Sequence, residues 1–203
     1  QIKKLNDQRS EIAGMSSFDD VLLLENYEKM LISYYIGMSF IQKKFTFGSK
    51  DDCVKLAFPW KDSLTGEKKS SKTDLSLELN SVLYNLGAVM NNIGVHTPLE
   101  GEAVKSVSQK FQEAAWIFDY MKKTTDTLAP SSRSHDFTVE NLLFHSTIQL
   151  AQSQYCFFKK AAKSFNLMEG ITQVFSRLSS KYSCQPTSFK KPCKIPSGRY
   201  VCQ

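Results

Sequence analysis

The fold is decided by residues 58–123, FPWKDSLTGEKKSSKTDLSLELNSVLYNLGAVMNNIGVHTPLEGEAVKSVSQKFQEAAWIFDYMKK. From about residue 73 to residue 93 an apolar side chain returns every three or four positions, which predicts a long buried helix. The same spacing predicts a second helix over residues 99–123. The small pairs Gly87-Ala88 and Ala114-Ala115 would let these helices pack closely. Gly94, with Pro98 just beyond it, predicts the end of the first helix.

Helical spacing also covers most of the remaining chain. The further predicted helices span residues 1–12, 21–45, 137–163 and 165–182, and Ser17 can cap the second of them. Residues 53–58 alternate with period two up to Pro59, and residues 64–72 resemble a polar loop. We therefore predict a mostly α fold, an antiparallel helical scaffold with tetratricopeptide-like helix packing and a short β element near residues 53–60. No clean repeat period predicts a regular solenoid.

The net charge of +6 is concentrated at one end of the chain. Residues 181–203 hold five basic and no acidic residues, whereas the other 180 residues carry 21 basic and 20 acidic side chains. A nearly neutral body argues against a nucleic-acid-binding face. The composition also changes sharply after Tyr182. We expect residues 1–182 to form the domain and residues 183–203 to be a basic tail, containing Cys and Pro, outside the core.

The cysteines and the hydropathy pattern bear on location. Five cysteines include no C-x-x-C pair, and the tail spacing fits no familiar zinc pattern. Cys53 and Cys156 look like small core residues, which favours a reducing, cytoplasmic setting. The sequence shows neither a membrane-spanning apolar run nor a signal peptide, so neither a membrane span nor secretion is expected.

Catalytic patterns are missing from the sequence. His96, His135 and His145 lie far apart, and His145 has no acidic or cysteine residue one helical turn away. No glycine-rich phosphate loop and no nucleophile elbow occur. We therefore expect a non-enzymatic protein that uses no metal, no cofactor and no small-molecule substrate.

Two clusters stand out as candidate sites. Trp60 and Asp62 suit a buried corner in which the carboxylate accepts backbone or capping hydrogen bonds. Phe157 and Phe158 point about 100° apart on a helix, so at most one is expected deep in the core. An exposed phenylalanine beside Lys159, Lys160 and Lys163 suits a groove for an acidic amphipathic helix, although plain core packing remains an alternative.

Several motifs together resemble the BRO domain family, the helical scaffold of Alix, rhophilin and the histidine-domain protein tyrosine phosphatase. Phe58, Trp60 and Asp62 match its F-x-W-x-D turn, and SVLYNLGA over residues 81–88 includes Asn85. FQEAAWIFDY over residues 111–120 and LAQSQYCFFKKA over residues 150–161 match two further helices. The order and spacing hold over roughly residues 20–182.

The resemblance implies a curved helical domain that binds the C-terminal amphipathic helix of Snf7-type ESCRT-III subunits. By position, it implies an apolar patch of Phe157, Ile171 and Phe175, with Lys105 and Lys160 near the acidic side of the peptide. An acidic contact residue of the family would fall at Gly101, so that contact is absent. The implied role is a non-catalytic adaptor in endosomal sorting or membrane remodelling.

Departures from the family pattern keep two alternatives open. The consensus Glu-Lys is Glu78-Leu79 here, the Ala-rich QAAGAF motif contains Trp116, and the Cys/Pro tail replaces further helices. One alternative is a rhophilin-like scaffold domain of Rho signalling. The other is a truncated fragment without binding activity.

Overall fold

A computed structural model of the chain describes residues 2–47, 53–54, 58–71, 75–128 and 134–164. Its α-helices are α1 (Ile2–Gly14), α2 (Val21–Lys44), α3 (Ser76–His96), α4 (Ala103–Thr124) and α5 (Val139–Ser164). A hairpin of β1 (Phe58–Lys61) and β2 (Lys68–Ser71) precedes α3, and 3₁₀ turns cover Thr125–Thr127 and His135–Phe137. The predicted mostly helical scaffold is confirmed.

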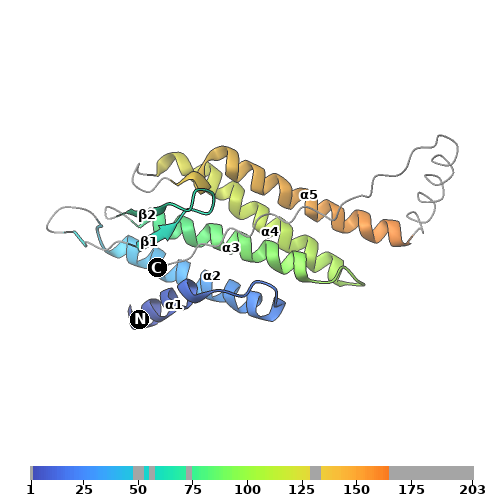
Figure 1. Cartoon of the computed structure of the whole chain (residues 1–203), viewed down its shortest axis with the longest axis horizontal. Helices are drawn as coiled ribbons and strands as arrows, with labels where there is room; N and C mark the ends of the chain where they lie inside the picture. The colour runs from blue at the N-terminus through green and yellow to red at the C-terminus, as the bar shows by residue number, and fades with distance from the viewer. Residues whose placement is uncertain (1, 48–52, 55–57, 72–74, 129–133, 165–203) are drawn as a thin grey trace.

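The helices form a stack in chain order. Figure 1 shows α3, α4 and α5 side by side, with α2 next to α3 and α1 against α2. The α3–α4 pair is antiparallel, because Gly87 faces Phe118 and Gly94 faces Phe111. The α4–α5 pair is antiparallel as well, with Ser108 hydrogen-bonded to Ser153 and Phe118 stacked on His145. Helix α3 is covered by α2 and α4, so most of its residues are buried.

Three local predictions are wrong, each for a physical reason. Helix α2 is capped by Asp20, whose carboxylate accepts from the N–H groups of Leu22 and Leu23, and not by Ser17. Gly94 does not end α3. It lies inside the helix, where the Phe111 ring would be 2.7 Å from an added Cβ, so its role is close packing. Helix α4 begins at Ala103, because residues 97–102 form the turn from α3.

The predicted β element near residues 53–60 is present, but its strand lies at the C-terminal end of that range. Strand β1 begins at Phe58 and not at Cys53, while Val54 makes only an isolated bridge to Phe47. The expected polar loop over residues 64–72 includes β2, which pairs antiparallel with β1 in the register Trp60 opposite Lys69. A strand of lysines and serines has no apolar alternation, so its pairing was not visible in the pattern.

Gly87 permits the close approach of α3 and α4 that the sequence predicts. An added Cβ would lie 2.7 Å from the Phe118 ring. That ring is held by Tyr84 edge-on and by His145 in a stack. We expect Gly87→Ala to lower the free energy of unfolding by about 1 kcal/mol, since overpacking of about 1–3 kcal/mol exceeds the helix-propensity gain of about 1 kcal/mol.

Urea denaturation followed by circular dichroism measures this effect. The matched control is Gly14→Ala at the end of α1, where an added Cβ would meet nothing within 4 Å. This control should be neutral or stabilising by up to about 1 kcal/mol. A Gly87→Ala variant as stable as the control would contradict the packing argument.

Candidate protein-binding site

The aromatic turn is anchored by a buried carboxylate. Glu78, at 1% exposure, accepts from Arg9 Nε at 2.8 Å, from the Tyr34 hydroxyl at 2.6 Å and from Trp60 Nε1. The Arg9 guanidinium also lies over the Trp60 ring, 4.9 Å from its centroid. Burial raises the pKa of Glu78, and Arg9 and the hydrogen-bond donors oppose that rise. This cluster joins α1, α2, β1 and α3.

Asp62 connects the β1–β2 hairpin to the turn before α5 through hydrogen bonds. Its carboxylate accepts from the N–H groups of Leu64 and Thr65 in its own turn, at 3.1 and 2.9 Å. It also accepts from the Ser134 hydroxyl at 2.5 Å and from the His135 N–H at 2.9 Å. The expected capping role of Asp62 is thus present in the structure.

A reciprocal bond completes this junction, because Asp136 accepts from the backbone N–H of Ser63 at 2.7 Å and from its hydroxyl. Burial alone would raise the pKa of Asp62, but the donors Ser134, Thr65 and Leu64 outweigh it, so the pKa is lowered. The residues of the family's structural motif therefore support the fold and lie away from the surface that could bind a partner. They are Phe58, Trp60, Asp62 and the buried Asn85.

The outer face of α5 is apolar. Its buried face includes Leu142, Gln149, Ser153 and Cys156. The rest of its surface exposes seven large apolar side chains: Val139, Leu143, Phe144, Leu150, Tyr155, Phe157 and Phe158. Phe157 is 45% exposed and Phe158 is 51% exposed, so both phenylalanines lie at the surface. Such an apolar helix face is typical of a protein-binding surface.

A pocket lies at the C-terminal end of α5, where α5 meets the turn between α3 and α4. Its volume is about 520 Å³. It is lined by Pro98, Leu99, Glu100, Gly101, Val104, Lys159, Lys160 and Lys163, and we call it the lysine pocket. Leu99 and Val104 belong to an apolar cluster with Val107, Phe111 and Cys156, so one wall of the pocket is apolar. The other wall carries three lysines.

The lysine pocket adjoins the apolar face of α5. Phe157 lies three residues before Lys160, and residues at that spacing share one side of a helix. Lys105 is exposed in the first turn of α4, directly after Val104 of the pocket wall. Burial raises the pKa of the Cys156 thiol beneath this region, although Lys159 acts in the opposite direction. The structure thus brings Phe157, Lys160 and Lys105 to one end of the helix stack.

Two members of the expected patch, Ile171 and Phe175, lie outside the described residues, as do the predicted helix over residues 165–182 and the tail over 183–203. Their placement stays a prediction. The sequence patterns also missed the wall formed by Pro98 to Gly101 and Val104. A signal was present in Pro98 and Gly101, which mark the turn between two predicted helices. If the following helix runs antiparallel to the second of them, its C-terminal end lies beside that turn.

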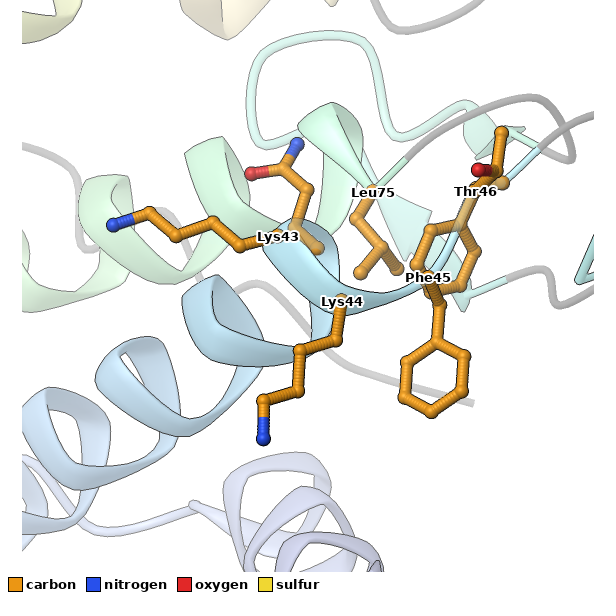
Figure 2. A pocket seen from close by; sticks show the side chains of 7 residues that line it. Lys43, Lys44, Phe45, Thr46 and Leu75 are labelled. Atoms are coloured by element: carbon orange, nitrogen blue, oxygen red, sulfur yellow. The ribbon is translucent and has the colours of Figure 1, made fainter.

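A second pocket of about 330 Å³ lies at the end of α2. It is lined by Gln42, Lys43, Lys44, Phe45, Thr46, Phe47 and Leu75. Figure 2 shows Lys43 and Lys44 extending away from Leu75 in different directions. Because their ammonium groups do not converge, this pocket is a weaker candidate for an anionic ligand than the lysine pocket.

The helical stack with an exposed apolar face has the form of a protein-interaction scaffold. The family model for the BRO1-like domain matches residues 1–192. The chain therefore belongs to the BRO1-like domain family, whose fold is a non-enzymatic protein-interaction fold.

Known relatives include both branches that the sequence suggested. ALG-2 interacting protein X of Dictyostelium discoideum is 30% identical over 183 residues, which is 90% of this chain and 22% of that protein. Rhophilin-2 of Mus musculus is 31% identical over 186 residues, 85% of this chain and 26% of that protein. The chain thus spans about a quarter of the length of these relatives.

A solved structure shows the same fold. The ALIX BRO1 CHMP4C complex matches with a TM-score of 0.67 and 28% identity, over 80% of this chain and 46% of that chain. The Alix protein in that structure is bound to CHMP4C. Within the part of this chain that the structure describes, no helix is both long and apolar enough to cross a bilayer.

Proposed function

We propose that this chain is an adaptor domain that binds the C-terminal amphipathic helix of a Snf7-type ESCRT-III subunit, on the cytoplasmic side of endosomal membranes. The observation that carries the proposal is the position of Phe157, an exposed phenylalanine on an apolar helix face beside a pocket lined by lysines. The match to the ALIX BRO1 CHMP4C complex supports the partner class.

Apolar burial would supply most of the binding energy. A fully buried large apolar side chain contributes about 1.5–3 kcal/mol, and Phe157 has roughly half of its surface left to bury. We propose that Ile171 and Phe175 add further anchors. An amphipathic helix binds such a surface through apolar residues at every third or fourth position.

Charge would set orientation and association rate. Lys160 lines the lysine pocket from α5, and Lys105 directly follows Val104 of the pocket wall in α4. Positive groups at one end of a groove attract the acidic face of a peptide and accelerate its approach, more strongly at low salt. The same arrangement disfavours a basic partner helix.

The test is titration of the 203-residue chain with a fluorescent peptide of the CHMP4C C-terminal helix. We expect Phe157→Asp to weaken binding by about tenfold or more, since it removes an apolar anchor and introduces a charge that repels the acidic peptide face. Fluorescence anisotropy gives the dissociation constant, and circular dichroism checks that the fold persists.

Phe40→Asp is the matched control. Phe40 is 60% exposed on α2, which packs on α3 and α1 and lies away from α5. This control should leave affinity unchanged. If Phe157→Asp binds as well as the parent chain while remaining folded, the groove assignment is wrong.

A rhophilin-like scaffold domain of Rho signalling is the second candidate, and the similarity to Rhophilin-2 favours it. In that case the peptide of CHMP4C would not bind the parent chain at all.

A further inference from the structure

The lysine pocket has a charge pattern that one carboxylate would not neutralise. Lys159, Lys160 and Lys163 line a single pocket, opposite one acidic residue, Glu100. Within the described residues, neither Lys159 nor Lys163 forms an ion pair with a carboxylate. The ammonium groups of Lys159 and Lys163 around one recess repel each other, and a ligand with two negative charges would relieve that repulsion.

The α4 helix adds to this positive potential. Gly101 and Val104, at the start of the 22-residue α4, line the pocket wall. The N-cap Glu102 makes no side-chain capping hydrogen bond. The positive end of a long helix stabilises an anion placed near its first turn. The helix end is a secondary contribution here, because the lysine cluster and the recess already point to an anion.

The shape of the pocket argues for an inserted side chain. With about 520 Å³ it has room for more than a carboxylate, and its wall of Leu99 and Val104 can take the aliphatic part of a residue. A flat membrane surface would meet the rim of such a recess and leave its interior unfilled. Phe157, the anchor of the proposed peptide groove, lies one helical turn before Lys160 of the pocket.

We infer that the lysine pocket binds a phosphate group carried by the partner helix, so that phosphorylation of that helix tightens its binding to this chain. This inference rests on the proposed function. A phosphorylated serine carries nearly two negative charges and three acceptor oxygens at neutral pH, which suits the ammonium groups of Lys159 and Lys163. Lysine acts as a point-charge donor for phosphate and needs no bidentate geometry.

The experiment uses the 203-residue chain and a panel of CHMP4C C-terminal helix peptides. Each peptide carries one phosphoserine, moved position by position along its polar face, and is compared with serine and alanine at that position. One position or two neighbouring positions should tighten binding about tenfold at physiological salt. The gain should shrink at pH 5.5, because the second phosphate pKa is about 6.

Two variants make the assignment specific. The double variant Lys159→Gln and Lys163→Gln should lose the phosphate gain, so that the phosphorylated and the unmodified peptide bind it with dissociation constants within about twofold of each other. The matched control neutralises Lys122 and Lys123, which pair with Asp119 on α4 away from the pocket, and should keep the gain. Equal gains in both variants, or no gain at any position, would overturn the inference.

The outcomes separate this inference from the proposed function. If the unmodified peptide does not bind the parent chain, the proposed function itself is wrong. Normal binding of the unmodified peptide without any phosphate gain refutes only the phosphate pocket. Vesicles containing phosphatidylinositol phosphates form a third arm: vesicle binding that the double variant abolishes, without a peptide gain, would assign the pocket to lipid and overturn the inference.

Discussion

Replacing Glu78 by alanine should lower the free energy of unfolding by about 3–5 kcal/mol, the range for removing one partner of a buried ion pair. The variant leaves three donors without their acceptor: Arg9 Nε, the Tyr34 hydroxyl and Trp60 Nε1. Because Glu78 joins α1, α2, β1 and α3, its loss should loosen the whole N-terminal half of the chain.

Chemical denaturation of the variant and the parent chain measures this effect. Glu11→Ala on the exposed side of α1 is the matched control and should change stability by less than about 0.5 kcal/mol. A second variant, Glu78→Gln, keeps the size and one acceptor oxygen but removes the charge opposite Arg9. It should fall between the alanine variant and the parent. If the free energy of unfolding of Glu78→Ala were within about 1 kcal/mol of the parent value, the cluster would not be a major source of stability.

Asp62→Ala should lower the free energy of unfolding by about 3 kcal/mol, because hydrogen bonds to a charged group contribute about 1.5–3 kcal/mol each and are only partly additive. The variant removes the acceptor of Ser134 and His135, which ties the hairpin to the start of α5. Asp126→Ala, an exposed aspartate in a neighbouring turn, is the matched control and should be close to neutral.

The contribution of Asp62 should also depend on pH in a defined direction. The folded-state pKa is lowered below the ordinary 3.8, so the native state holds the carboxylate ionised where the unfolded chain would protonate it. The stabilisation is therefore complete above the unfolded pKa and disappears as pH falls through the folded pKa. The stability difference between the parent and Asp62→Asn should be constant from pH 5 to 7 and shrink below pH 3.8. A difference that grows on acidification would contradict this assignment.

Tyr84 and His145 show how much of the core chemistry depends on packing between helices. Burial, together with the neighbouring Asp136 carboxylate, raises the pKa of Tyr84 to about 12. Burial lowers the pKa of His145, whose Nε2 lies 2.9 Å from the Tyr84 hydroxyl. The sequence predicts no partner for His145 one turn away on its own helix. Its partner comes from α3, 61 residues earlier.

The sequence by itself determined the α-helices that the structure describes, because an apolar stripe at helical spacing comes to lie on one face only when the segment is helical. It also predicted the close packing at Gly87, the buried corner of Trp60 and Asp62, and the family. Residues without periodic signal were predicted poorly. Strand β2 is a run of lysines and serines, and Gly94 looks like a helix end until the Phe111 ring is seen against it.

Only the tertiary structure decided where the charged residues meet. Glu78 lies in an apolar helix, and nothing local shows that Arg9, 69 residues earlier, is its partner. Likewise, Lys159 and Lys163 form a pocket only because α5 runs back alongside α4 and ends at the turn that follows α3. Periodicity reports which face of a helix is buried, whereas contacts between helices depend on how the chain returns in space.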